Sequence, residues 1–251
     1  MTRRRWMADE VNGNTAALVG EHAAHLERVL RAEVGQEFDI ATGDEVRRGT
    51  ITTISSDRIE FALGGKPYHT RRSKASVAAK VTLALAIFKF DRMEWAIEKC
   101  TEIGVARIIP VIARRSDAHL AAAAVKRHER WQRIIRQASE QSRRSAPPEI
   151  AVPVKLKDLA SDGVLPVNAT RVVLAESLVD SEEGARLEDV LQSRPSSGEV
   201  VLAVGPEGGW ADGERSWFYE AGWAEASLGD TILRAETAAI VATALALEAL
   251  R

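Results

Sequence analysis

Residues 199–210 read Glu-Val-Val-Leu-Ala-Val-Gly-Pro-Glu-Gly-Gly-Trp, an apolar run that leads directly into a glycine-rich loop. A short apolar run that ends at glycine and proline predicts a buried strand followed by a tight turn. Glycine allows a positive φ and close backbone approach, and proline fixes one φ, so the loop can present bare N–H and C=O groups to a ligand. Taken alone, the motif favours an ordinary strand-to-helix turn over a ligand site.

Strand and helix patterns alternate on both sides of this stretch, from about residue 76 onward. Apolar runs predict strands at 80–87, 105–112, 171–175, 199–204 and 224–228. Between and after them, apolar residues at helical spacing predict helices at 91–103, 123–143, 212–221 and 235–250. Such alternation is typical of an α/β fold built on a parallel sheet.

Residues 1–75 have a different pattern, which predicts a small β-rich domain. Short strands are expected at 37–41, 48–54 and 58–63, with a turn at Gly64–Pro67 and a helix at 22–31. The basic stretch 71–74 is expected to be a linker. The sequence therefore predicts two domains, residues 1–75 and residues 76–251.

The composition is that of a soluble protein with an ordinary hydrophobic core. The chain has 251 residues, 45% hydrophobic and 28% charged, and its single cysteine, Cys100, excludes an internal disulfide. No apolar run is long enough to span a bilayer, and no apolar segment follows the first basic residues, so we expect a cytoplasmic protein without a signal peptide.

The net charge of −2 conceals a polarised distribution. Residues 114–157 contain 11 basic and 4 acidic residues, whereas residues 158–251 contain 6 basic and 17 acidic residues. A basic block in a nearly neutral chain is compatible with a polyanionic partner, and equally with a solvated helix.

Three loops follow predicted parallel strands: residues 175–177, 205–209 and 229–234. Ligands of open α/β sheets bind at this edge. Glu236 and Thr237 are explained by capping of the last helix. Arg234 is not, because a cation just before a helix N-terminus opposes the helix dipole; it needs an anionic partner, either Glu207 or a substrate.

The stretches 205–210 and 228–238 resemble the two signature blocks of the SPOUT methyltransferases. The resemblance is closest to the ribosomal RNA small-subunit methyltransferase E family, which methylates N3 of a uridine in 16S rRNA. Residues 91–105 resemble that family's first helix, 131–143 its second block, and 25–31 the start of its N-terminal domain. The five blocks occur in the family's order and cover nearly the whole chain.

The resemblance implies a PUA-like β-rich RNA-binding domain over residues 1–75 and a SPOUT domain with a C-terminal trefoil knot over residues 76–251. It implies a homodimer that uses S-adenosylmethionine and acts on 16S rRNA or the assembled small ribosomal subunit, with no metal and no membrane. The cofactor-binding residues would be Leu174, Ala175, Glu176, Gly205, Pro206, Gly208, Gly209, Leu228, Gly229, Ile232, Leu233, Glu236, Thr237 and Ala238.

The same resemblance suggests a mechanism. We expect Arg234 to stabilise negative charge on the uracil ring, and Glu207 either to hold that arginine or to accept the N3 proton. Basic clusters are the expected RNA contacts: Arg3, Arg4, Arg5, Arg31, Arg71, Arg72, Arg143 and Arg144. Ala211 stands where the family often has Ser or Thr, so Asp212 is expected to cap the following helix.

Two alternatives stay open at this point. A SPOUT enzyme with another RNA target, such as a tRNA ribose hydroxyl, would use a similar donor pocket. A non-catalytic RNA-binding or ribosome assembly factor would need no intact donor loops. A Rossmann-type methyltransferase is disfavoured, because no Gly-x-Gly-x-x-Gly follows an early strand.

Overall fold

The computed structural model describes residues 5–43, 45–68, 81–175, 185–193 and 198–250. Contacts divide the chain into two units, residues 1–76 with 136–147 and residues 77–135 with 148–251. Each unit has its own sheet and its own hydrophobic core. Helix α3 (Ala118–Gln141) begins in the second unit, and its last turns belong to the first.

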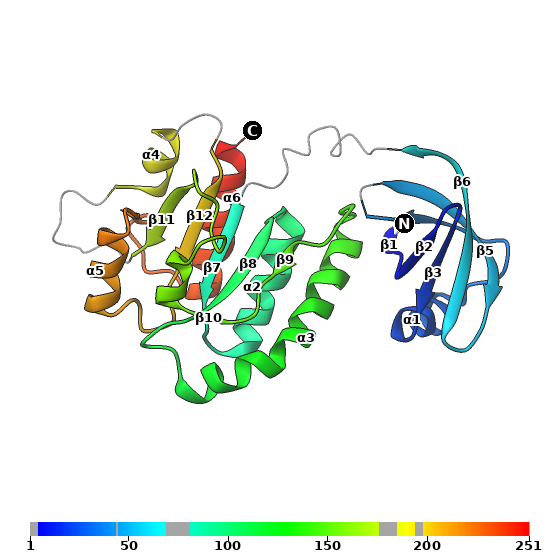
Figure 1. The fold of residues 1–251 in the computed structure, drawn as a ribbon, viewed down its shortest axis with the longest axis horizontal. Helices are drawn as coiled ribbons and strands as arrows, with labels where there is room; N and C mark the ends of the chain where they lie inside the picture. Colours follow the sequence, from blue (N-terminus) through cyan, green and yellow to red (C-terminus); the bar gives the residue numbers. More distant parts are fainter. Residues whose placement is uncertain (1–4, 44, 69–80, 176–184, 194–197, 251) are drawn as a thin grey trace. The chain divides into compact units, whose positions relative to one another are not determined.

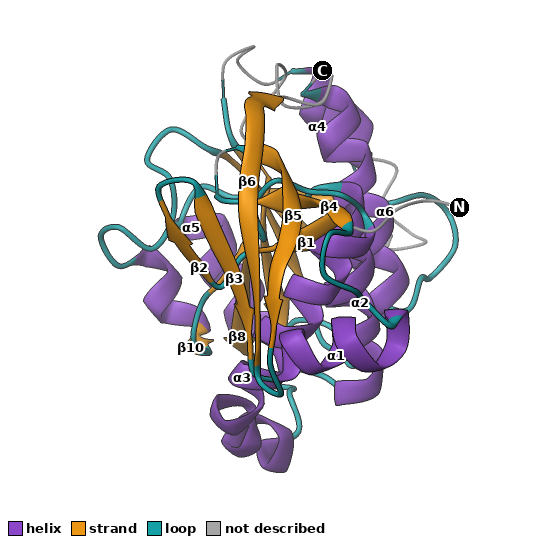
Figure 2. Cartoon of the chain, turned by 90° about the vertical axis from the view of Figure 1, so that its right-hand side faces the viewer, coloured by secondary structure: helices purple, strands orange, loops and turns teal. Residues whose placement is uncertain are grey.

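The N-terminal unit is a six-stranded mixed sheet with one helix, α1 (Glu21–Leu30). Its strands are β1 (Arg5–Met7), β2 (Glu10–Asn12), β3 (Thr15–Val19), β4 (Glu37–Ala41), β5 (Val46–Ile54) and β6 (Arg58–Tyr68). They lie in the order β1-β4-β5-β6-β3-β2, and only β1 and β4 pair in parallel. In Figure 2, α1 lies beside the long strands of this unit. Trp6, Leu18 and Leu26 are among the side chains that fill its core.

The C-terminal unit is built on a parallel sheet (Figure 1). Its strands are β7 (Val81–Ala86), β8 (Arg107–Ile112), β9 (Glu149–Ile150), β10 (Val154–Lys155), β11 (Thr170–Leu174), β12 (Val200–Val204) and β13 (Ala224–Ala226). The order is β10-β8-β7-β12-β11-β13, and β9 pairs with β8. Its helices are α2 (Phe90–Ile103), most of α3, η1 (Leu156–Ala160), α4 (Leu187–Gln192), α5 (Asp212–Glu220) and α6 (Ala235–Ala249).

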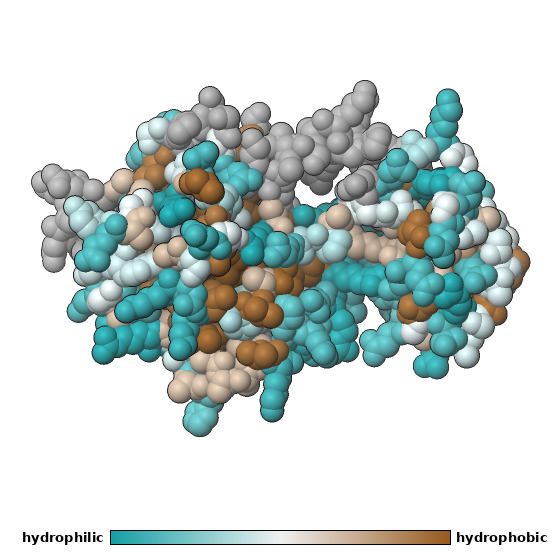
Figure 3. All heavy atoms as spheres, viewed as in Figure 1, coloured by the Kyte–Doolittle hydropathy of each residue, from teal (hydrophilic) through white to brown (hydrophobic). Residues whose placement is uncertain are grey.

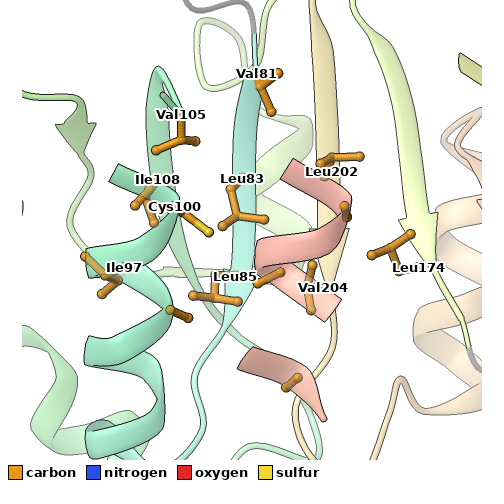
Figure 4. Close-up of a cluster of buried hydrophobic side chains, with 14 of the residues drawn as sticks. Val81, Leu83, Leu85, Ile97, Cys100, Val105, Ile108, Leu174, Leu202 and Val204 are labelled. Carbon is orange, nitrogen blue, oxygen red and sulfur yellow. The ribbon is translucent and has the colours of Figure 1, made fainter. Parts of the chain in front are cut away.

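Both faces of this sheet are covered, which explains why its central strands β7 and β12 are almost entirely apolar. On one face, Leu83 and Leu85 of β7 pack with Ile97 and Cys100 of α2 and with the alanines of α6, as Figure 4 shows. On the other face, Ala84 of β7 belongs to a second cluster that includes residues of η1 and α5. Helical spacing predicts a buried α2 stripe of Met93, Ala96, Ile97, Cys100 and Ile103. All are buried except Ile103, which is 41% exposed at the end of the helix.

Polar side chains cover much of the face drawn in Figure 3, because the large apolar residues are used inside the clusters. Trp131 and Met93 are both 0% exposed, so their prediction as core residues is confirmed. Among the described helices, none combines the length and the hydropathy that crossing a bilayer requires.

Three details of the prediction are wrong. Gly64–Pro67 is not a turn: β6 continues to Tyr68, and the extra residues are absorbed by a register shift against β5. Strands β1, β2, β3, β9 and β10 and helices η1 and α4 were not predicted; all of them are short, with two to six residues. Asp212 does not cap α5; Ala211 is the N-cap residue, and the Glu214 carboxylate accepts the Ala211 N–H at 2.9 Å. The predicted linker 71–74 lies outside the described residues.

Candidate functional site

The carboxyl ends of β7, β12, β11 and β13 meet at one edge of the parallel sheet. There a cavity of about 640 Å³ opens between the segments that follow these strands. The structure brings Ala175 and the predicted loops 205–209 and 229–234 together around it. Its lining includes the predicted residues Leu174, Ala175, Gly205, Pro206, Glu207, Gly208, Gly209, Leu228, Gly229, Ile232, Leu233, Arg234, Glu236 and Ala238.

The loop after β12 is a tight turn. The Gly209 N–H donates to the Pro206 carbonyl at 2.8 Å, and Gly209 has a φ of +67°, which favours glycine. Gly205 lies against the Trp210 ring, since a Cβ at Gly205 would be 3.2 Å from Trp210 Nε1. The loop thus folds closely over the indole, and main-chain atoms face the cavity.

Arg115, which follows β8, holds this loop from the side. Its Nη1 donates to the Gly208 carbonyl at 2.8 Å and to the Trp210 carbonyl at 3.3 Å. The preceding residue is fixed as well, because the Glu214 carboxylate accepts the Arg114 N–H at 2.7 Å. Glu214 is 9% exposed and therefore joins the start of α5 to the segment that carries Arg115.

The end of β13 and the residue after it are bonded to the residue after β11 and to the start of α4. The Ala175 N–H donates to the Ala226 carbonyl at 3.1 Å. Ser227 donates to the Ala185 carbonyl at 3.0 Å and accepts the Leu187 N–H at 2.9 Å. Gly229 then turns the chain with a φ of +122°. Helix α6 begins at its N-cap residue, Arg234.

Some of the charged groups at the cavity are already paired. Glu236 is 3% exposed and accepts a hydrogen bond from Arg92 Nη1 at 3.0 Å. Arg215 Nη2 pairs with Glu225 at 2.7 Å. The predicted pairing of Arg234 with Glu207 is not formed. Both side chains are exposed and have no ion-pair partner among the described residues.

Two of the predicted cofactor-binding residues are not among the residues that line the cavity. Glu176 lies outside the described residues. Thr237, in the first turn of α6, is not part of the lining. Sequence reasoning in turn missed several residues that do line it: Lys89, Arg92, Arg115, Asp212 and Arg215. The first three follow β7 and β8, and the same rule about carboxyl ends of strands could have found them.

The predicted RNA contacts have different surroundings. Arg3, Arg4, Arg71 and Arg72 lie outside the described residues. Arg31 and Arg143 are exposed, each with a positive φ.

Two further arginines of that set are less accessible. Burial lowers the pKa of the Arg144 guanidinium to about 10, so it stays charged at neutral pH. Arg5 is only 2% exposed, and its Nη1 donates to the Arg143 carbonyl. Arg5 is therefore buried in this structure, and its guanidinium bonds to the main chain just after α3.

Cys100 and the histidines offer no further chemistry. Burial raises the pKa of the Cys100 thiol to about 12, although a hydrogen bond with Thr243 opposes the rise. Within the described part of the chain, no three His, Cys, Asp or Glu side chains are grouped as metal ligands. His22 instead hydrogen-bonds Asp9.

Comparison with known proteins gives one consistent result. The sequence model of the RNA methyltransferase domain matches residues 75–247. The ribosomal RNA small subunit methyltransferase E of Mycobacterium bovis is 33% identical over 241 residues, which is 92% of this chain and 85% of that protein. Its counterpart from Synechocystis is 32% identical over 231 residues, which is 92% of this chain and 72% of that protein.

A solved structure agrees with these sequence matches. The crystal structure of ribosomal RNA small subunit methyltransferase E from Neisseria gonorrhoeae, bound to S-adenosyl methionine, superposes with a TM-score of 0.79. The two chains are 27% identical, and the match covers 96% of this chain and 95% of that one.

Proposed function

This chain belongs to the RNA methyltransferase domain family and, within it, to the ribosomal RNA small subunit methyltransferase E proteins, and we propose that it methylates N3 of a uridine in 16S rRNA. The methyl donor in this proposal is S-adenosylmethionine, which is bound in the Neisseria gonorrhoeae relative. One observation carries the proposal: the loops that end β11, β12 and the segment after β13 converge on a single cavity.

The cavity suits such a nucleoside cofactor. Its volume of about 640 Å³ is within the range of small-molecule sites, roughly 300–1,000 Å³. Leu174, Leu228 and Leu233 offer apolar contacts for an adenine ring. The glycines at 205, 208, 209 and 229 leave main-chain groups accessible for hydrogen bonds.

The chain's own residues must hold the uracil ring and remove its N3 proton. When bound, the cofactor supplies an electrophilic methyl group. Arg234 is exposed at the cavity and unpaired among the described residues, so it is free to stabilise negative charge that develops on the ring. Glu207 lines the same cavity and either accepts the N3 proton or orients Arg234.

The domain assignment is part of the proposal. Residues 1–75, which supply the sheet of the N-terminal unit, form a PUA-like RNA-binding domain. The mixed sheet with helix α1 beside it supports this assignment. Residues 76–251 form a SPOUT domain with a trefoil knot. The bonds between Ser227 and residues 185–187 support it, because they fix the chain after β13 against the segment between β11 and α4. The protein acts in the cytoplasm as a homodimer.

Arg234→Ala tests this function most directly. We expect it to abolish methyl transfer to small ribosomal subunits while S-adenosylhomocysteine still binds in isothermal titration. The matched control is Arg171→Ala, at the opposite end of β11. Full turnover by the Arg234 variant would exclude the role of this arginine.

Two measurements on the wild-type protein distinguish this function from the two alternatives, another RNA target and a non-catalytic RNA-binding role. Methylated nucleosides in transfer RNA but not in 16S rRNA would indicate another RNA target. Failure to bind S-adenosylhomocysteine would favour a non-catalytic RNA-binding protein.

A further inference from the structure

Five basic side chains line the main cavity, and they differ in their partners: Lys89, Arg92, Arg115, Arg215 and Arg234. Arg92 and Arg215 are paired with glutamates. Arg115 is bonded to two loop carbonyls. Arg234 has a role in the proposed reaction. Lys89 remains: it is exposed and makes no hydrogen bond or ion pair through its side chain within the described residues.

Lys89 also borders a second, smaller cavity of about 310 Å³. This cavity lies at the ends of β7, β8 and β12 and contains no residue of the segments 174–175 or 228–238, which line the proposed donor site. Only two basic residues line both cavities, Lys89 and Arg115. Because Arg115 is already engaged with the loop, Lys89 is the cation available at the boundary between them.

The main chain of Lys89 is held firmly, so the position of the side chain is defined at its base. The preceding segment is fixed by the Ile87 N–H, which donates to the Val111 carbonyl at 2.8 Å. The Lys89 carbonyl accepts the N–H groups of Arg92 and Met93, at 3.1 and 2.9 Å, as α2 begins. A cation at this position opposes the dipole of α2, and an anionic partner would compensate that cost.

We propose that Lys89 binds a backbone phosphate of the RNA substrate next to the target uridine and so positions that nucleotide over the methyl donor. This proposal rests on the proposed function. A base placed in the main cavity carries its phosphates to the cavity mouth, where an unpaired ammonium group can meet them as a point charge. Asp117, the acidic residue in the small cavity alone, is occupied by the N–H groups of His119 and Leu120, at 2.7 and 3.2 Å.

Lys89→Gln tests the proposal, with Lys89→Arg as the conservative variant and Lys157→Gln as the control. Lys157 is an exposed lysine on η1 that lines neither cavity. We expect Lys89→Gln to raise the KM for the RNA substrate about tenfold, as for a lost charge-assisted hydrogen bond, with kcat changed less than twofold. Lys89→Arg should restore the KM, and Lys157→Gln should match the wild type.

Two further measurements identify the ligand of Lys89. The slope of log Kd for RNA against log salt concentration should fall in magnitude by about 0.7 to 0.9 in Lys89→Gln, as expected for one lost phosphate contact. Affinity for S-adenosylhomocysteine should be unchanged.

An unaltered KM and salt slope would overturn the proposal, and so would a tenfold loss of S-adenosylhomocysteine affinity, which would assign Lys89 to the cofactor. Failure of the proposed function has a different signature, because the wild-type protein itself would then not methylate rRNA.

Discussion

Glu214 provides the sharpest test of how the cavity wall is held. Its carboxylate accepts two main-chain N–H groups through different oxygens: Ala211 through Oε2 at 2.9 Å and Arg114 through Oε1 at 2.7 Å. It is 9% exposed, so water replaces these bonds poorly. The two bonds join the start of α5 to the segment before Arg115, whose side chain holds the Gly208 carbonyl.

Glu214→Gln removes one of these bonds at nearly constant volume. The amide has a single acceptor oxygen, so its NH₂ group must face the other N–H donor. Losing one charge-assisted bond and leaving a buried donor unpaired should lower the free energy of unfolding by about 2 kcal/mol. For a chain of this length, we expect the melting temperature to fall by about 4–8 °C.

Thermal unfolding followed by circular dichroism measures this effect. The control is Glu220→Gln on the same helix, since Glu220 is exposed and its side chain has no partner in the described part of the chain. We also expect weaker binding of S-adenosylhomocysteine in Glu214→Gln, because Arg115 loses its anchored position. A Glu214→Gln variant that melts within about 1 °C of the wild type, like the control, would contradict the predicted loss of about 2 kcal/mol. The Glu214 carboxylate would then not stabilise the cavity wall.

Three further predictions follow from the described contacts. Gly205→Ala places a Cβ 3.2 Å from Trp210 Nε1, so the indole must shift, and we expect about fivefold weaker S-adenosylhomocysteine binding by titration calorimetry. Burial raises the pKa of Cys100 from its usual value of 9.0 to about 12, so the folded thiol should not react with Ellman's reagent at pH 8, whereas guanidinium should expose it. The unfolded thiol ionises first as pH rises, so this group should also remove about 1.4 kcal/mol of stability per pH unit between those two values. Burial alone would raise the pKa of Asp9, but hydrogen bonds from His22 and Val19 and the charge of Arg136 outweigh it and lower the pKa. Asp9→Asn should therefore destabilise the protein at pH 7, and urea unfolding should show the difference disappear as acid protonates the folded carboxyl.

The sequence predicted the C-terminal unit better than the N-terminal one, for a physical reason. A strand buried on both faces, such as β12, is apolar at every position and ends at a recognisable turn. A helix such as α2 shows its buried stripe at helical spacing. Strands of three residues, such as β1, have too little length for either signal, and their pairing depends on residues more than thirty positions away.

In the site, too, features set by local sequence were predicted and features set by distant residues were not. The loop at 205–209 was predicted because glycine and proline mark a turn whatever surrounds it, and the sheet edge follows from parallel strands. The burial of Arg5 was not predictable, since it depends on the Arg143 carbonyl 138 positions further along the chain. Lys89 and Arg115 were missed because no motif marks their loops, although both residues follow predicted strands at the same edge of the sheet. Only the order of strands in the sheet places them beside Gly208.

The charged side chains at the cavity differ in whether they already have a partner. Glu236 is buried, and its charge is answered by Arg92 before any ligand arrives. Arg234 and Lys89 are the N-cap residues of α6 and α2, positions where a cation is disfavoured by the helix dipole. Glu207 lines the same cavity but pairs with neither cation. Its side chain is exposed and has no ion-pair partner among the described residues. In the proposed reaction, bound anions offset this dipole cost, and a polynucleotide would supply two of them: the uracil ring that loses its proton and the phosphate beside it.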